Sequence, residues 1–112
     1  MRKIGEGEPI SGQEAVGILR KVETLEDVLR LMETDLSETI VFTPSASVTA
    51  ITPILPKIRG LICASGGFTS HLAIVAREFD LPCVMGCQLE GVNALEGRRV
   101  RFTAEGEVFL EE

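Results

Sequence analysis

The segment at residues 60–86, GLICASGGFTSHLAIVAREFDLPCVMG, constrains the fold more than any other part of the chain. The run GLICAS predicts a buried strand over 60–65, because it is short and apolar and is followed by a glycine pair that predicts a tight turn. After the turn, TSHLAIVAREF predicts a helix over 69–79, and LPCVMG predicts another strand over 81–86. A strand, a turn, a helix and a strand in this order indicate an α/β domain, with central strands flanked by a helical layer.

Two N-terminal segments add a strand region and a second helix. Glycines alternate with short apolar pieces over 4–22, which predicts bent or paired strands with turns near Gly7 and Gly12. The segment TLEDVLRLMETDL at 24–36 predicts an amphipathic helix that starts at Thr24 and has Asp27 in its first turn. Its spacing puts four apolar side chains on one helical face, which we expect to be buried: Leu25, Val28, Leu29 and Met32.

The remaining segments complete the expected sheet. TIVFTP at 39–44 predicts a short buried strand stopped by a proline, and the proline-interrupted connector at 48–58 has room for a short helix. The tail at 98–112 predicts a hairpin with its turn at the sequence AEG.

Length and charge narrow the class of protein. At 112 residues the chain suits one domain with a single core, and we expect residues 1–112 to form it. The formal net charge of −6 argues against nucleic acid or an anionic membrane as a partner, because clustered Lys and Arg bind phosphates. Arg99 and Arg101 share one face of a strand, which predicts a solvated sheet face. No segment resembles a signal peptide or approaches the ~20 apolar residues of a membrane span, so we expect a soluble, cytoplasmic protein.

The cysteines bear on metal binding and on redox state. Cys63, Cys83 and Cys87 form no CxxC pair, and a single histidine does not complete a common zinc set with them, so no metal site is expected. An odd number of cysteines, two of them within apolar runs, predicts reduced, buried thiols and not a disulfide framework.

The only histidine of the chain, His71, stands directly behind the glycine pair. Gly66 and Gly67 have no Cβ, so the backbone can turn sharply and bring N–H groups close to a bound group. Thr69 or Ser70 can cap the following helix, which places His71 in its first turn. Unpaired N–H groups and the positive end of the helix dipole favour an anion there. They also disfavour a protonated ring, which leaves a neutral imidazole nitrogen to act as a nucleophile.

Simpler roles compete with this hypothesis, since a histidine at a helix start can merely cap or pack. The turn is not a Walker loop, and Ser70 beside His71 is not a hydrolase pair, because neighbouring helical side chains diverge. The residues thus predict an anion-favouring histidine and leave open whether the anion is covalently attached. We expect Arg77 to pair with another element and not with phosphate. Ser11 and Gly12 are candidates to lie near the histidine.

The segment at 52–86 closely resembles the phosphohistidine mobile domain of phosphoenolpyruvate-utilising enzymes. That group includes pyruvate phosphate dikinase, phosphoenolpyruvate synthase and enzyme I of the sugar phosphotransferase system. Weaker likeness at 7–17 and 95–108 extends the resemblance over nearly the whole chain. The matching core consists of Gly66-Gly67, the triplet Thr69-Ser70-His71, the run at 73–78, and Pro82 with Gly86.

The resemblance implies the family's three-layer β/β/α swivelling fold, with His71 as the phosphoryl acceptor. It implies that Thr69 hydrogen-bonds near the phosphoryl group, that Ser70 completes the catalytic triplet, and that Gly66 and Gly67 bind phosphate. The domain is expected to move between a nucleotide-binding partner and a phosphoenolpyruvate- or pyruvate-binding partner, which are separate domains or subunits. No cofactor is expected on this chain alone, and Mg²⁺ is expected in the partner domains.

Together these features predict a stand-alone phosphohistidine carrier, because the chain lacks a nucleotide-binding loop, a dense arginine cluster and a second histidine. The alternative is a regulatory or interaction module that keeps the fold and is never phosphorylated. The acidic composition motivates it, as do Phe68 and Leu72, which stand where other members often have a basic or polar residue and an alanine. An independent phosphatase or hydrolase is disfavoured, because no second acid, base or metal set accompanies the histidine.

Overall fold

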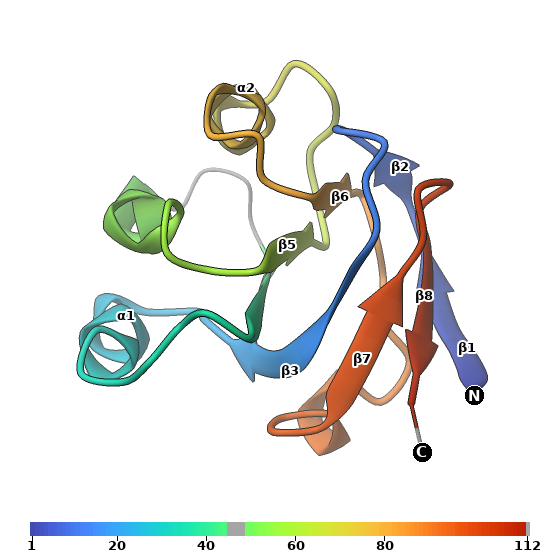
Figure 1. Ribbon diagram of the computed structural model, residues 1–112, viewed down its shortest axis with the longest axis horizontal. Helices are drawn as coiled ribbons and strands as arrows, with labels where there is room; N and C mark the ends of the chain where they lie inside the picture. Colours follow the sequence, from blue (N-terminus) through green and yellow to red (C-terminus); the bar gives the residue numbers. More distant parts are fainter. Residues whose placement is uncertain (45–48, 112) are drawn as a thin grey trace.

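The computed structural model describes residues 1–44 and 49–111. Within them it contains strands, two α-helices and two 3₁₀ helices (Figure 1). The strands are β1 (Arg2–Glu6), β2 (Glu8–Pro9), β3 (Ala15–Lys21), β4 (Thr39–Thr43), β5 (Gly60–Cys63), β6 (Cys83–Met85), β7 (Arg99–Phe102) and β8 (Glu107–Leu110). The helices are α1 (Leu25–Leu31), η1 (Thr49–Ile54), α2 (His71–Glu78) and η2 (Val92–Ala94).

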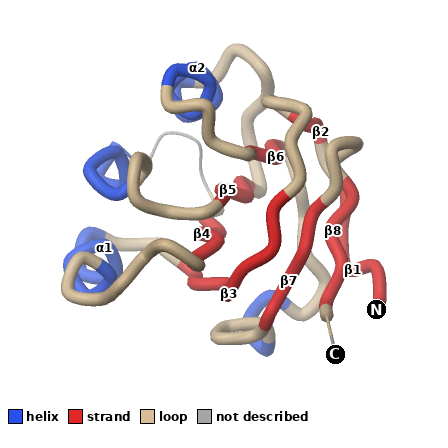
Figure 2. The backbone as a smooth tube through the Cα atoms, in the orientation of Figure 1, coloured by secondary structure: helices blue, strands red, loops and turns tan. Residues whose placement is uncertain are grey.

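The strands form one eight-stranded sheet in the order β1-β8-β7-β3-β4-β5-β6-β2. Its centre is parallel: β3 pairs with β4, β4 with β5, and β5 with β6. The outer pairs are antiparallel. Thr43 lies opposite Cys63 in the register, so the carboxyl ends of β4 and β5 meet at one edge of the sheet. The loop to α2 leaves from that edge (Figure 2).

Two buried apolar clusters lie on opposite faces of the central strands. Side chains alternate between the faces of a strand, so Val41 of β4 joins one cluster while its neighbours Ile40 and Phe42 join the other. The first cluster holds the strands against α1, η1 and α2, through residues such as Val28 and Leu72. The second lies between the central strands and the β7–β8 hairpin with β1. The α/β class expected from the sequence is confirmed.

The strands expected at 39–44, 60–65 and 81–86, the helix at 69–79 and the C-terminal hairpin are confirmed as β4, β5, β6, α2 and β7–β8. The N-terminal region forms three strands that pair with other parts of the sheet and not with one another. The connector contains the 3₁₀ helix η1, while its first residue, 48, lies outside the described residues. No helix in the described part of the chain is long and apolar enough to cross a lipid bilayer.

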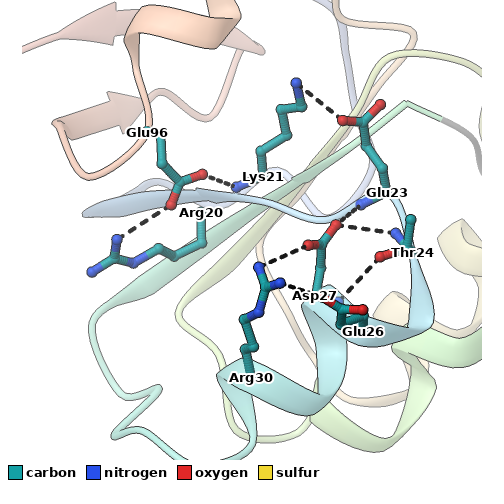
Figure 3. Close-up of polar contacts among 8 residues, drawn as sticks. All are labelled: Arg20, Lys21, Glu23, Thr24, Glu26, Asp27, Arg30 and Glu96. Atoms are coloured by element: carbon teal, nitrogen blue, oxygen red, sulfur yellow. Dashed lines mark hydrogen bonds and ion pairs between the residues drawn. The ribbon is translucent and has the colours of Figure 1, made fainter.

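The start of α1 is as expected, but its buried face is not. Thr24 caps the helix, and Asp27 returns the bond to the cap, which completes a capping box (Figure 3). Of the four apolar side chains predicted to be buried, only Val28 is, whereas Leu25 is 60% exposed, Leu29 53% and Met32 47%. The helix contacts the core through Val28 and the partly buried Leu31, a neighbouring stripe of the same helix. That prediction was therefore wrong, because contact with η1 and the sheet selects a face that periodicity alone does not.

The tip of the β7–β8 hairpin packs on the N-terminal region. The N–H of Gly7 donates to the carbonyl of Gly106 at 2.9 Å. Gly106 has φ of +90°, and a Cβ placed there would stand 2.2 Å from the carbonyl oxygen of Gly7. Only glycine fits this contact, which fixes the backbone immediately before β2.

Candidate functional site

The candidate site is the glycine turn, residues 66–70, together with the first residues of α2. Gly66 opens the turn with φ of +87°, a conformation that side-chain-bearing residues rarely adopt. Ser70 is the N-cap: its hydroxyl oxygen accepts from the N–H of Ala73 at 3.4 Å. The hydroxyl and the N–H of Ser70 also donate to the carbonyl of Gly67, at 2.8 Å and 3.0 Å. Of the two expected caps, Ser70 takes the role, and Thr69 is exposed beside it.

His71 is the first residue of α2, and its side chain is exposed. The next two residues, Leu72 and Ala73, are fully buried and anchor the helix on the sheet. The first turn of α2 contains no acidic residue, so its N–H groups and dipole are not neutralised from within the helix. This arrangement presents an imidazole to solvent at the end of a helix that favours a negative charge.

The residue before Thr69, Phe68, is held by two charged side chains that come from elsewhere. The Oε1 atom of Glu8 in β2 accepts from the N–H of Phe68 at 3.1 Å. The Nη1 atom of Arg77 donates to the carbonyl of Phe68 at 2.7 Å, and the guanidinium lies 3.8 Å above the centre of the Phe68 ring. Arg77 therefore contacts the turn itself, through a carbonyl and a ring. Glu8 was not among the expected site residues, because nothing in its local sequence indicates a contact sixty positions away.

Ser11 and Gly12 do not lie at the histidine. The N–H of Ile10 donates to the carbonyl of Cys83 at 2.9 Å, and the side chain of Gln13 donates to Asp80 at 2.7 Å. Asp80 follows the carboxyl end of α2, opposite the end that carries His71. The antiparallel pairing of β2 with β6 accounts for this placement, since it puts Glu8 toward the glycine turn and directs the chain away from the turn after Pro9.

A comparison with known protein families matches residues 36–105 to the mobile domain of PEP-utilising enzymes. The match includes the whole glycine turn and α2. The chain belongs to this family. The resemblance expected from residues 52–86 is thereby confirmed for a longer segment.

Relatives of this mobile domain are much longer proteins. The chain is 30% identical over 95 residues to a rifampicin phosphotransferase of Bacillus subtilis, and the match covers 85% of this chain and 10% of that protein. It is 29% identical over 105 residues to the phosphoenolpyruvate synthase of Escherichia coli, covering 93% of this chain and 13% of that protein. The chain thus spans about a tenth of the length of the curated relatives it matches.

Solved structures share the fold of this mobile domain. The N-terminal domain of Enzyme 1 - Nitrogen has a TM-score of 0.53 at 21% identity, over 69% of this chain and 32% of that one. The holo-form of aconitase X from Thermococcus kodakaraensis has a TM-score of 0.63 at 23% identity, and the match covers 100% of both chains. At these identities the likeness concerns the fold and not the activity.

The thiols of this mobile domain are buried away from solvent. Cys63, Cys83 and Cys87 are free and buried, as the sequence predicted. Burial raises the pKa of Cys83 to about 12 and that of Cys87 to about 11, and it also raises the pKa of Cys63. At neutral pH all three stay protonated, so they are poor nucleophiles.

A hollow of about 390 Å³ lies away from the glycine turn, between α1 and the end of β3. Its cationic side chains already have acidic partners: Arg20 pairs with Glu96 at 3.2 Å, and Arg30 pairs with Glu26 (Figure 3). None of its lining residues belongs to the turn. The positive charges of Arg20 and Arg30 in this hollow are therefore compensated by acids of the same chain.

Proposed function

We propose that this chain is a phosphohistidine carrier, in which His71 accepts a phosphoryl group from one partner and passes it to another. The observation that carries the proposal is the exposed His71 at the first position of α2, directly behind the glycine turn, within the segment that matches the mobile domain. Thr69 and Ser70 flank the phosphoryl group in this proposal, and the backbone of Gly66 and Gly67 lies against its oxygens.

The transfer consists of two displacements at phosphorus. In the first, the lone pair of a neutral imidazole nitrogen attacks the phosphorus, an N–P bond forms, and the P–O bond to the donor breaks. The electron pair of that bond leaves with the donor oxygen. In the second, an acceptor oxygen attacks, the N–P bond breaks, and the imidazole regains its lone pair. The N–H groups at the start of α2 stabilise the charge on the phosphoryl oxygens in both steps.

The partners belong to the same proposal. The relatives that contain this domain are larger phosphotransferase and synthase proteins, which supports a division of labour between the carrier and other domains. We assign nucleotide binding to one partner and phosphoenolpyruvate or pyruvate binding to the other, with Mg²⁺ held by those partners. A stand-alone carrier that swivels between them in the cytoplasm, with its strands and helices in the family's β/β/α layers, completes the proposal. The two buried clusters on opposite faces of the central strands support that layering.

The test is direct detection of the phosphoryl group. The protein is incubated with extract of its source cells and with ³²P-labelled ATP or phosphoenolpyruvate, and is then analysed at alkaline pH, because phosphohistidine is acid-labile. We expect an acid-labile label on His71 that is absent from His71→Asn, a variant of similar shape without a nucleophilic ring. Wild-type protein that stays unlabelled with both donors contradicts the carrier function.

A binding module without phosphorylation is the second candidate. The full-length structural match to aconitase X supports it, because that match indicates that the fold also occurs outside phosphoenolpyruvate-utilising enzymes. In this case the partner fraction binds wild-type protein and His71→Asn equally, and neither becomes labelled. Labelling of His71 together with loss of transfer in His71→Asn contradicts this second candidate.

A further inference from the structure

Both peptide groups of Phe68 are occupied by charged side chains from outside the glycine turn. Its N–H donates to Glu8, and its carbonyl accepts from Arg77. Bonds of this kind, with one charged partner, are roughly twice as strong as those between neutral groups. A Cβ placed on Gly67 would stand 3.2 Å from Oε1 of Glu8, so the carboxylate lies directly against the turn. Phe68 is thus clamped from two sides.

The backbone that carries Glu8 is held firmly by the sheet. Glu8 lies opposite Met85 in the pairing of β2 with β6. On one side of it, Gly7 is bonded to the hairpin tip at Gly106, and on the other, Ile10 is bonded to Cys83, each at 2.9 Å. The backbone that carries the carboxylate is therefore tied to two different parts of the sheet. Because the backbone of Glu8 is held in place, its carboxylate limits the movement of the glycine turn.

The restraint reaches His71 through a short path. Phe68 is followed by Thr69 and by Ser70, whose N–H and hydroxyl both donate back to Gly67. The backbone from Gly67 to Ser70 is therefore closed on itself by Ser70 and fixed in space by Glu8 and Arg77. His71 is the next residue, so the direction in which its ring leaves α2 depends on this segment.

We propose that Glu8 is a positioning residue for phosphoryl transfer: by accepting the N–H of Phe68, it holds the glycine turn in the conformation that presents His71 to the partner. The inference rests on the proposed carrier function. It assigns Glu8 no contact with the phosphoryl group. Arg77 is the second half of the clamp, and its contact with the Phe68 ring gives it a packing role that Glu8 lacks.

The test compares Glu8→Ala and Glu8→Gln with wild type and with Glu6→Ala. Glu6 is a matched control, because it lies two residues earlier in the same segment, with an exposed side chain that pairs only with Lys3 among the ion pairs of the described residues. Transfer from the labelling partner fraction is measured against carrier concentration. For Glu8→Ala we expect the rate at saturation to fall about ten- to a hundredfold, the effect of a small misplacement of a reacting group, with an unchanged half-saturating concentration. Glu8→Gln, which keeps an acceptor oxygen, recovers part of the rate, and Glu6→Ala matches wild type.

Two further measurements distinguish a positioning role of Glu8 from a loss of folded structure and from failure of the proposed carrier function. Amide hydrogen exchange of Phe68 is expected to accelerate in Glu8→Ala while the core strands stay protected. Phosphoramidate, a small donor that phosphorylates imidazole without a partner, is expected to label His71 equally in wild type and Glu8→Ala. Equal partner-driven rates in wild type and Glu8→Ala overturn the inference, as does unchanged exchange at Phe68. Wild-type protein that is labelled by phosphoramidate but by no partner fraction contradicts the proposed function instead.

Discussion

The two α-helices of this domain lie on the same side of the sheet (Figure 1), yet only α1 has acidic residues in its first turn. At α1, the carboxylate of Asp27 accepts from the backbone N–H groups of Glu23 and Thr24, at 2.9 Å and 3.1 Å. Both caps are neutral hydroxyls, Thr24 at α1 and Ser70 at α2, but the first turn of α2 contains no acid.

The difference separates a structural helix start from one that is available for chemistry. A carboxylate in the first turn offsets the positive end of the helix dipole. The start of α1 therefore supplies negative charge from its own side chains, Glu26 and Asp27. The first turn of α2 has no acid of its own, because the nearby Glu8 comes from β2 and bonds Phe68 ahead of the helix, and its first residue is the only histidine of the chain.

The largest effect is expected from a variant that gives α2 an acid at the position where α1 has one. Ala73 occupies the position in α2 that Asp27 occupies in α1, but it is fully buried. The N–H of Ser70 is already bonded to Gly67, so a new carboxylate finds no partner at the cap. We expect Ala73→Asp to lower the free energy of unfolding by about 3 kcal/mol in urea denaturation. Ala73→Asn, with similar shape and no charge, is the control, and a loss below about 1 kcal/mol for Ala73→Asp contradicts the comparison.

Removing the two caps tests whether they differ in function as well as in structure. Thr24→Ala and Ser70→Ala each remove a side-chain acceptor at a helix start, and each is expected to cost about 1 kcal/mol of stability. Only Ser70→Ala is expected to slow labelling of His71, because Thr24 lies at the other helix. Both quantities can be measured on the same preparations by thermal unfolding and by ³²P incorporation. An equal effect of the two variants on labelling contradicts a special role for the start of α2.

A charge placed on the exposed side of α2 is expected to have a smaller effect, which concerns the equilibrium phosphorylation of His71. Ile74 is 42% exposed and lies three positions after His71, about one turn along the helix. We expect Ile74→Glu to lower the equilibrium amount of phosphohistidine about two- to fivefold, because its carboxylate repels the phosphoryl group. Ile74→Gln controls for the loss of the apolar side chain. Quantitative ³¹P NMR of the phosphorylated protein measures the ratio, and identical amounts in the two variants disprove the electrostatic explanation.

The smallest expected effect concerns Asp27 in α1 and the pH dependence of the free energy of unfolding. The backbone N–H of Glu23, and then that of Thr24, hold the pKa of Asp27 below its ordinary value. A carboxyl whose pKa is lower in the folded state stabilises the fold above its unfolded pKa, and this stabilisation is lost as the pH falls through the folded value. We expect the stability difference between wild type and Asp27→Asn to be constant above about pH 5 and to shrink below about pH 4. Urea denaturation across this range measures it, and a difference that grows on acidification is the contrary result.

The sequence was informative where a feature is local. The central strands, α2 with its cap, the capping box of Thr24 and Asp27, and the hairpin all depend on residues within a few positions of one another. The buried face of α1 was not predictable in this way, because Leu25 and Leu29 have the periodicity of a core face and yet lie in solvent. The contact of Glu8 with Phe68 depends on the pairing of β2 with β6, which no local pattern specifies. The histidine was thus found from its neighbours in sequence, and its supporting residues only from the structure.

The contact between Gly7 and Gly106 has a genetic consequence. It holds the backbone next to Glu8 and leaves no space for a side chain on Gly106. A random mutagenesis screen for carriers that fold but transfer slowly is therefore expected to recover substitutions at Gly106, thirty-five positions after His71 in the chain. Its position in the sequence alone would not connect such a substitution with the glycine turn.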